Sequence, residues 1–432
     1  MAWDFETEPE FQRELDWMDE FVREQIEPLD HVLTEGYEVA SPLAKKLLTP
    51  LKNQVKERGL WACHLGPELG GEGFGQLKLA LMNEILGRSR YAPLVFGCQA
   101  PDTGNAEILA HYGSPSQKKR YLEPLLNGDI LSCYSMTEPH AGADPTLFTT
   151  RAVRDGDEWV INGEKWFSSN ARYASFLIVM CVTDPDVSPY QGMSMLIVPT
   201  DAPGVETVRN VGVGMEREEH WSHAHIRYND VRVPADHMLG APGSAFVIAQ
   251  TRLGGGRIHH AMRTVAQVRK AFDMLCERAL SRRVRAGRLA EFQMTQEKIA
   301  DSWIDLEQFR LLVLRTAWKI DRYQDYKKVR GDIAAIKILT PRVYHDVTQR
   351  AIQLHGALGV SNDLPLVSMM ISAYSLGIAD GPTEVHKITL AKQILRDHRG
   401  VEGLYPSEHL PTLRESARAR FAELLEGEIG NY

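Results

Sequence analysis

Two stretches in the middle of the sequence combine residue types that could hold a flat ligand. Residues 134–145 (YSMTEPHAGADP) pack small residues, hydroxyls and prolines together, which predicts an irregular turn. Such a turn can direct several backbone N–H and C=O groups at one ligand. Residues 161–170 (INGEKWFSSN) bring an aromatic ring, Phe167, and a hydroxyl, Ser169, to alternating strand spacing. Together the two stretches predict a binding site for a planar molecule.

Both stretches resemble motifs of the acyl-CoA dehydrogenases, a family of flavoproteins. In that family a TEPxAGSD-like turn and a hairpin that ends in an aromatic and a hydroxyl together grip the isoalloxazine of FAD. The resemblance implies that Thr137 lies near the pyrimidine edge of the flavin and that Ser169 lies near N5, where hydride arrives. Phe167 stands where the family usually has a stacking tryptophan, and any aromatic face can serve. FAD is therefore the expected cofactor.

By the same resemblance, Tyr134, Met136 and Ala143 are expected beside the cofactor. Ala143 replaces a serine that often bonds the FAD pyrophosphate, so we expect that contact to be missing or moved. The alternative interpretation is structural, with Thr137 as a turn hydroxyl and Phe167 as a core residue. Because both motifs occur together at the right spacing, the cofactor interpretation is preferred.

A carboxylate near the end of the sequence could supply the chemistry. Asp380 lies in residues 378–384 (IADGPTE), where most of the family has a tyrosine, the catalytic glutamate and then GT. The reaction needs a carboxylate that takes a weakly acidic α-proton from a thioester while hydride leaves the β-carbon. Aspartate is about 1.5 Å shorter than glutamate, so the backbone or the substrate must approach more closely. Alternatively, Asp380 only caps the helix expected from about Thr383, and Glu384 is then the next candidate for the base.

The surroundings of Asp380 narrow the resemblance. A subgroup of the family, sometimes fused to a phosphotransferase-like kinase domain, has an ADGP-type motif here and a run similar to residues 253–260 (LGGGRIHH). This sequence resembles that subgroup most, without the kinase part. The family analogy also places Gly381 at the substrate and Pro382 at the cofactor.

Two arginines are expected on the helices of the C-terminal region. Arg257 follows the glycine run, near where the family keeps an arginine at the acyl-CoA site. Arg282 heads residues 281–293 (SRRVRAGRLAEFQ), which resemble the RxxFGxxLxxxQ signature whose arginine reaches the FAD phosphates of a neighbouring subunit. A guanidinium fork suits a pyrophosphate. Arg285 replaces the phenylalanine of that signature, so the local packing should differ, and Arg283 or Arg285 could act instead of Arg282. The alternative interpretation is that the arginine is simply solvated, as a single arginine on a helix usually is.

Residues 353–359 (QLHGALG) resemble the QxxGGxG turn that meets the same cofactor from the partner chain. The expected contacts are Gln353, His355 and Gly356. With Arg282, they imply an FAD site built between subunits, so we expect a homo-oligomer, either a dimer or a homotetramer.

His220, His223 and His225 (HWSHAH) cluster closely enough to raise the possibility of a metal. In a strand, His223 and His225 would face the same side, as metal ligands can. No cysteine or carboxylate follows at ligand spacing, so we expect no metal and interpret these residues as half-buried or solvated. His259 and His260 have no partner that the sequence reveals.

The elements that must position these residues fall into three regions and a tail. The order of periodicities is helical, alternating and helical again, which indicates an α+β protein of two or three packed domains. We expect an N-terminal all-α domain over residues 1–128, an antiparallel β-barrel or sandwich over 129–237, and an antiparallel four-helix bundle over 238–400. A tail helix within 401–432 lies outside the family pattern.

The middle region carries the β signals. Asp155-Gly156 and Asn162-Gly163 are tight-turn dipeptides flanked by strand formers. Further strands are predicted over residues 175–182, 195–199, 205–211 and 223–233. Because no helical pattern separates these strands, a parallel α/β sheet and an NAD-binding Rossmann enzyme are disfavoured.

The C-terminal region shows long amphipathic helices. One stripe places Leu306, Phe309, Val313, Ala317 and Ile320 on a single face. Residues 413–425 have one apolar face before Gly427, which predicts an extra helix that packs on the body or on a neighbour.

Composition limits the partners. The chain has 432 residues and a net charge of −8, which speaks against a general affinity for nucleic acid or anionic membranes. Its 5 cysteines form no CxxC pair and indicate reduced thiols. There is no signal-peptide pattern and no apolar run long enough for a membrane span. We therefore expect a cytoplasmic enzyme.

The expected reaction is FAD-dependent oxidation of an acyl-CoA to the 2,3-enoyl-CoA, as in fatty acid β-oxidation, with electrons passed to an electron-transfer flavoprotein. Two alternatives are open: an oxidase of the same fold, similar to acyl-CoA or nitroalkane oxidases, and a flavin-free scaffold. The acyl chain length, branching and hydroxylation depend on pocket shape and are not predicted.

Overall fold

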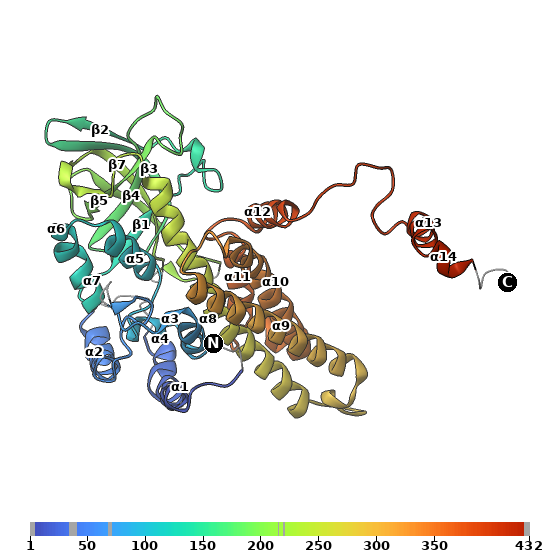
Figure 1. The fold of residues 1–432 in the computed structure, drawn as a ribbon. Helices are drawn as coiled ribbons and strands as arrows, with labels where there is room; N and C mark the ends of the chain where they lie inside the picture. Colours follow the sequence, from blue (N-terminus) through green and yellow to red (C-terminus); the bar gives the residue numbers. More distant parts are fainter. Residues whose placement is uncertain (1–4, 34–40, 68–70, 215, 219–220, 427–432) are drawn as a thin grey trace.

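The computed structural model describes residues 5–33, 41–67, 71–214, 216–218 and 221–426 of the chain (Figure 1). Helices occupy the N-terminal region, and the first buries Phe11, Leu15, Met18 and Phe21, which recur at helical spacing and face the core. The α-helices of this region are α1 (Pro9–Phe21), α2 (Pro42–Glu57), α3 (Gly75–Leu86), α4 (Ala92–Val95), α5 (Asp102–Tyr112), α6 (Pro115–Gln117) and α7 (Glu123–Asn127).

The middle region is one sheet, ordered β6-β7-β3-β2-β4-β5-β8, with β1 attached to β4. The predicted strands are confirmed to within two residues. The pairing is antiparallel apart from β1 against β4 and a single parallel contact between β2 and β4. The strands are β1 (Ser132–Ser135), β2 (Arg151–Asp155), β3 (Glu158–Ser169), β4 (Phe176–Val182), β5 (Met193–Pro199), β6 (Val205–Val211), β7 (His223–Pro234) and β8 (Met238–Leu239).

One of the two predicted tight turns is wrong. Asp155-Gly156 does connect β2 to β3, but Asn162-Gly163 lies inside β3. The register of β3 against β7 shifts beside Gly163, whose φ is +143°. A Cβ at this position would lie 2.7 Å from the Cα of Thr150. The glycine therefore serves a bulge and a close backbone approach.

The C-terminal region is helical and centres on α8, a helix of 37 residues. The predicted stripe of α9 is buried throughout. Helix α8 packs on α5 of the N-terminal region and on α9 and α10, so it links the sheet to the bundle (Figure 1). The elements are α8 (Ala245–Ser281), β9 (Arg283–Val284), β10 (Gly287–Arg288), α9 (Gln293–Tyr323), α10 (Arg330–His355), α11 (Leu366–Leu376) and α12 (Thr383–Arg396).

The chain ends in a segment that projects away from the body (Figure 1). It contains α13 (Leu410–Arg420) and α14 (Ala422–Leu425), so the predicted tail helix is interrupted at Phe421. None of the helices in the described part of the chain combines the length and apolarity needed to cross a bilayer.

Candidate active site

Asp380 lies in the short turn between α11 and α12, in a backbone conformation that is uncommon for a residue with a side chain. Its φ is +55°, and that of the following Gly381 is +104°. Helix α12 begins at Thr383, its N-cap is Pro382, and no side chain caps it. The interpretation of Asp380 as a helix cap is therefore wrong. A non-glycine residue with a positive φ is a common feature of functional sites.

Hydrogen bonds hold the backbone carbonyl of Asp380, whereas its carboxylate is not engaged in the same way. Arg257 donates from Nε to the Asp380 carbonyl at 2.9 Å, and His386 Nε2 lies 3.3 Å from the same oxygen. The nearest polar atom recorded for the carboxylate is His260 Nε2, at 3.5 Å from Oδ2. Within the described residues, no donor lies at hydrogen-bond distance from the carboxylate. The side chain is only 16% exposed, so its lone pairs face a sheltered space.

The glycine run of α8 explains how a short carboxylate fits here. A Cβ on Gly256 would lie 3.2 Å from Asp380 Oδ2, and one on Gly255 would lie 2.6 Å from Glu107 Oε2. A Cβ on Gly254 would meet the ring of Tyr326 at 3.4 Å. Each glycine inside a helix costs about 1 kcal/mol relative to alanine. The glycine run therefore lowers the stability of the helix, but it allows two carboxyl groups and a tyrosine to approach the helix backbone closely.

Positive charge surrounds Asp380. Burial raises the pKa of its carboxyl, but the positive groups around it, His260 first and then Arg252, Arg257 and Lys337, outweigh burial and hold that pKa below the ordinary value. Burial lowers the pKa of Lys337 to about 8 and that of His260 to about 4. Asp380 is therefore ionised near neutral pH, with the His260 imidazole beside it.

Arg252 connects this carboxylate to the sheet. Its guanidinium carbon lies 3.9 Å from the centre of the Tyr134 ring on β1, and its Nε donates to Asn105 Oδ1 at 2.9 Å. The Tyr134 hydroxyl is buried, and no protein group bonds to it in the described chain. Its burial raises the pKa of this phenol, and the charge of Asp380 adds to that effect. A neutral buried hydroxyl without a partner is a feature that a bound ligand could satisfy.

The turn after β1 and the end of β3 are joined directly. The Trp166 amide donates to the Thr137 carbonyl at 2.7 Å. The register of β3 shifts between Lys165 and Ser168, and Phe167 has a φ of +55°. The simple alternation predicted for Phe167 and Ser169 is therefore wrong, because a bulge turns this part of the strand. Both residues still meet one partner: the Phe167 ring stacks on His223 at 4.5 Å, and Ser169 Oγ lies 2.8 Å from His223 Nδ1.

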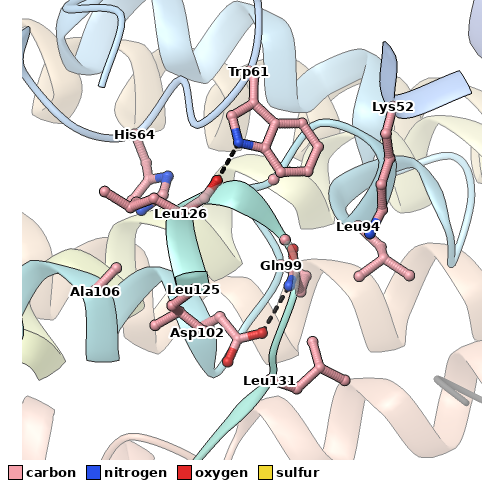
Figure 2. Close-up of a pocket in the computed structure, with 12 residues that line it drawn as sticks. Lys52, Trp61, His64, Leu94, Gln99, Asp102, Ala106, Leu125, Leu126 and Leu131 are labelled. Atoms are coloured by element: carbon pink, nitrogen blue, oxygen red, sulfur yellow. Dashed lines mark hydrogen bonds between the residues drawn. The ribbon is translucent and has the colours of Figure 1, made fainter. Parts of the chain in front are cut away.

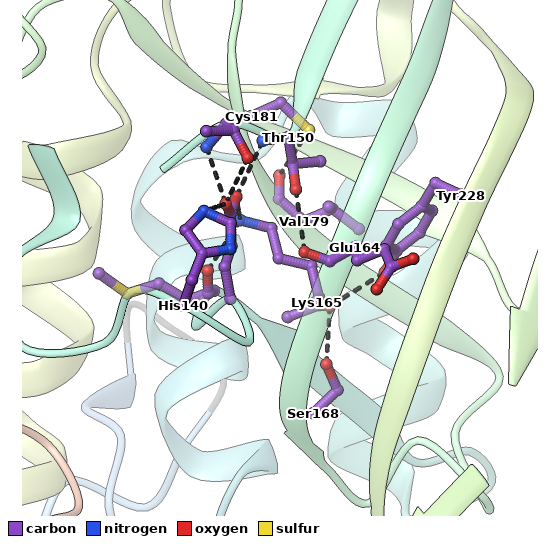
Figure 3. A network of polar contacts seen from close by, with 12 residues as sticks. His140, Thr150, Glu164, Lys165, Ser168, Val179, Cys181 and Tyr228 are labelled. Atoms are coloured by element: carbon purple, nitrogen blue, oxygen red, sulfur yellow. Dashed lines mark hydrogen bonds and ion pairs between the residues drawn. The ribbon is translucent and has the colours of Figure 1, made fainter. Parts of the chain in front are cut away.

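A buried ion pair between Lys165 and Glu138 fixes the shape of the same turn (Figure 3). Lys165 Nζ lies 2.9 Å from Glu138 Oε1 and donates to the Met136 carbonyl at 2.8 Å. Glu138 also accepts from the Thr149 amide at 2.7 Å and from the Thr150 amide at 2.9 Å. Although burial raises the pKa of Glu138, Lys165 and the two amides bring that pKa down to about 2. The turn therefore has a fixed shape before any ligand arrives.

The histidines proposed as metal ligands have other partners. His223 belongs to the stack just described, and His225 Nε2 lies 2.8 Å from Glu164 Oε2. His220 lies outside the described residues. The described residues contain no group of three or more histidine, cysteine or acidic side chains that could hold a metal ion.

A small cavity lies among residues of the N-terminal helical region (Figure 2). It has a volume of about 10 Å³ and is lined by Lys52, Trp61, His64 and Asp102 among others. Burial raises the pKa of Asp102 to about 6 and lowers that of His64 to about 3. Neither ring nitrogen of His64 has a recorded partner within the described chain. The cavity has room for about one water molecule, so it does not hold an acyl chain.

Comparison with known proteins covers nearly the whole chain. Sequence models of the N-terminal, middle and C-terminal domains of acyl-CoA dehydrogenases match residues 8–129, 133–231 and 243–395. The chain is 42% identical over 393 residues to the "Probable acyl-CoA dehydrogenase FadE2" of Mycobacterium tuberculosis, covering 90% of this chain and 92% of that protein.

The chain belongs to the acyl-CoA dehydrogenase family.

Two further comparisons agree with this assignment. The chain is 41% identical to the "Acyl-CoA dehydrogenase family member 11" of Gallus gallus, covering 88% of this chain but only 49% of that protein. It thus spans about half the length of that relative. The solved "Structure of a putative acyl-CoA dehydrogenase from Mycobacterium abscessus" superposes with a TM-score of 0.84 at 37% identity, and the match covers 91% of this chain and 100% of that one.

The structure separates the predicted family contacts into two sets. Tyr134, Met136, Thr137, Phe167 and Ser169 line the turn and the end of β3. Ala143 lies in the exposed part of that turn.

Arg257, Asp380, Gly381 and Pro382 form the carboxylate site and are connected to Tyr134 through Arg252, as described above. These residues and the turn therefore belong to one continuous region of a single chain.

The second set lies at the other end of the bundle. Arg282 is not within a helix, because α8 ends at Ser281, and its side chain is exposed. Arg278 Nη2 donates to the His355 carbonyl at 3.3 Å, which brings the end of α8 to the end of α10. The turn predicted from Gln353 begins only at Gly356, because Gln353 and His355 are still within α10. Arg257 and Arg278 are separated by about 30 Å along α8, at about 1.5 Å per residue. The two sets of residues therefore lie far apart along α8 within one chain.

Sequence reasoning missed the polar residues that surround Asp380. His260, Arg252, Lys337 and Glu107 come from α8, α10 and α5, and they meet only through helix packing. The one available signal was the triple glycine run, which marks a place where other groups approach a helix closely.

Proposed function

We propose that the chain is an FAD-dependent acyl-CoA dehydrogenase that converts an acyl-CoA thioester to the 2,3-enoyl-CoA, with Asp380 as the base. One observation carries this proposal above the others. Asp380 has its backbone fixed by Arg257 and its carboxylate ionised, sheltered and without a donor at hydrogen-bond distance in the described chain. A carboxylate in this state can accept a proton from a bound substrate.

Each neighbour of Asp380 has a defined part in this proposal. The carboxylate takes the proton from the α-carbon of the thioester, and Gly256 leaves the space in which the shorter acid can lie. Arg252, Arg257 and Lys337 keep it ionised until the substrate arrives. An acyl chain that displaces water from this space would weaken the solvation of the charged form and make the carboxylate a stronger base.

The residues present fit FAD. The unpartnered Tyr134 hydroxyl, the fixed turn at Thr137 and the Phe167 ring, which is 40% exposed, provide polar and stacking contacts for a flat heterocycle. Bound FAD would accept the hydride that leaves the β-carbon. Ser169 and Met136 complete the rim on which the ring system would rest.

We further propose that the working enzyme is a homo-oligomer. The separation of the two contact sets along α8 supports a site in which Arg282, Gln353, His355 and Gly356 of one copy meet the cofactor of another. Their exposure in the single chain is consistent with this role for Arg282, Gln353 and Gly356. A homotetramer is the expected form of the assembly.

The electron acceptor is proposed to be an electron-transfer flavoprotein, with a cytoplasmic enzyme acting in fatty acid β-oxidation. The ADGP sequence at Asp380 supports placement in the subgroup that has an aspartate base. Mixing the substrate-reduced protein with air tests the acceptor: slow return of the yellow colour is expected, and rapid return would instead indicate an oxidase.

The purified protein tests the proposal as a whole. We expect absorption near 450 nm, bleached anaerobically by at least one acyl-CoA in a panel of different chain lengths and substituents. A colourless protein that does not take up added FAD would contradict it and support a flavin-free scaffold.

A further inference from the structure

The last described helices form an amphipathic segment without a partner in the single chain. We define the arm as residues 410–425, which contain α13 and α14. Leu410 and Leu413 lie three residues apart on α13, and Phe421 and Leu424 lie three residues apart at α14; they are 58%, 41%, 47% and 76% exposed. The arm stands clear of the body in Figure 1. An apolar stripe of this length is unfavourable in water and indicates a binding surface.

A matching surface lies on the outer face of α9. Met294, Ile304 and Leu311 are 72%, 45% and 39% exposed, and Trp303 beside them is 52% exposed. The outward residues repeat with the three-and-four spacing of a helix-pairing seam: Met294, Glu297, Asp301, Ile304, Gln308 and Leu311. The inner face of α9 is buried in the bundle, and its outer face is a continuous surface on which a second helix could pack.

The charges of the two surfaces are complementary. Exposed Glu297 and Asp301 on α9 have no ion pair among the described residues, and the same holds for Arg414 and Arg418 on α13. Helix α12 also exposes apolar side chains, but it carries Lys387, Lys392 and Arg396 against one acid, Glu384, and would repel the arm. Electrostatics therefore selects α9 as the docking surface.

We propose that the arm of one copy packs on α9 of a second copy of this chain. Leu413 and Phe421 would pack against Ile304 and Trp303, and the two arginines would approach the two acidic residues. The arm lies beyond residue 395, where the matches to the family domains end, so this contact would be additional to the cofactor-sharing assembly proposed above. It does not depend on the proposed reaction.

Cross-linking between two differently tagged full-length copies tests the proposal. One copy carries Leu413→Cys and the other Ile304→Cys, both with Cys276→Ser, because Cys276 is the one cysteine that is not buried. A short bismaleimide should join the two copies at least about tenfold faster than in the control pair, since docking holds the thiol introduced at position 413 within reach of the one at position 304 at a high effective concentration, whereas a thiol at position 415 faces away. The control replaces Leu413→Cys by Glu415→Cys, which lies on the opposite face of α13.

Charge reversal provides the second measurement. Glu297→Lys with Asp301→Lys should slow the cross-link by about tenfold or more, and adding Arg414→Glu with Arg418→Glu to the other copy should restore it. Equal rates for the two arm cysteines would overturn the proposal. So would a link formed only within one chain that carries both cysteines, because the arm would then fold back on its own α9.

Discussion

Two buried carboxylates, one in the sheet and one in the bundle, lie close to positive side chains and both have lowered pKa values. Glu138 accepts from Lys165, from two backbone amides and from the Thr149 hydroxyl. Asp380 has comparable positive charge nearby, yet no hydrogen bond to its carboxylate is present in the described chain. The first carboxylate is saturated and the second is not.

This difference distinguishes a carboxylate that stabilises the fold from one that can react. A carboxylate whose lone pairs are all engaged cannot accept a substrate proton without losing several hydrogen bonds. A carboxylate that is held through its backbone and stabilised by charges at a distance has lone pairs available. Burial and a low pKa alone therefore do not identify the base; the pattern of donors does.

The largest effect should come from Asp380→Asn. The exchange is nearly isosteric, so the protein should fold, bind FAD and show normal acyl-CoA-induced changes in the flavin spectrum. Loss of the proton acceptor should slow flavin reduction by about 10²–10⁴-fold, measured by anaerobic stopped flow. Asp380→Glu should lose less rate, because the longer acid overshoots a site that is shaped for aspartate. Near-normal reduction in the Asn variant would redirect attention to Glu384.

Glu138→Gln should affect stability instead of chemistry. The substitution leaves Lys165 buried without its counter-charge, which typically costs about 3–5 kcal/mol in the free energy of unfolding. Denaturant unfolding of the FAD-bound protein should show this loss, with flavin reduction changed far less than in Asp380→Asn. The control is Glu158→Gln, since Glu158 pairs with Arg232 at 3.0 Å on the surface and should contribute less than about 1 kcal/mol. Similar losses in the two variants would show that the Glu138 pair does not stabilise the fold.

The stability contributed by Glu138 should depend on pH in one direction. Its folded pKa of about 2 lies below the ordinary value of 4.5, so the contribution is complete above about pH 4.5 and is lost as the pH falls toward 2. The wild type should therefore lose on the order of 3 kcal/mol relative to Glu138→Gln across that window. A constant difference between the two proteins over the same range would contradict the assignment.

Arg282→Ala should weaken FAD binding and subunit association together. Loss of a charge-assisted contact costs typically about 1.5–3 kcal/mol, or roughly ten- to a hundred-fold in affinity. Cofactor content and sedimentation would report both effects. Arg288→Ala, which removes an exposed arginine on β10, is the matched control. Wild-type behaviour of Arg282→Ala would make Arg283 or Arg285 the next candidate.

Gly256→Ala should have the smallest effect on the rate of flavin reduction, and it should act only on the Asp380 site in the bundle. The added Cβ would lie 3.2 Å from Asp380 Oδ2, so the carboxylate must shift by a few tenths of an ångström. We expect flavin reduction to slow by about 10-fold, because small misplacements of a reacting group are costly. Gly254→Ala is the control, since its Cβ would make an ordinary contact with Tyr326 at 3.4 Å. Equal rates in both variants would contradict a role for Gly256 in placing the base.

The sequence predicted those features that depend on local pattern. The strands β4 to β7, the buried stripes of α1 and α9 and the position of Asp380 in a turn before α12 all follow from spacing and turn chemistry. The Asn162-Gly163 prediction was wrong, because the same dipeptide also suits a bulge, and only the neighbouring Thr150 reveals which applies.

The surroundings of the base could not be predicted in this way. His260, Lys337 and Asp380 are far apart in the sequence and come together only because α8, α10 and the turn after α11 pack against each other. The bulge at Phe167 likewise depends on pairing with β7. Spacing along the chain carries no information about such contacts unless the packing is known.

The central claim is that Asp380 accepts the α-proton, and isotope exchange tests it most directly. An acyl-CoA with sulfur in place of the β-carbon can lose its α-proton but cannot transfer hydride. In D₂O the wild-type protein should exchange the α-hydrogens of this analogue for deuterium, detected by NMR, and Asp380→Asn should exchange them about 10²–10⁴-fold more slowly. Undiminished exchange in Asp380→Asn, with the analogue bound normally, would contradict the account.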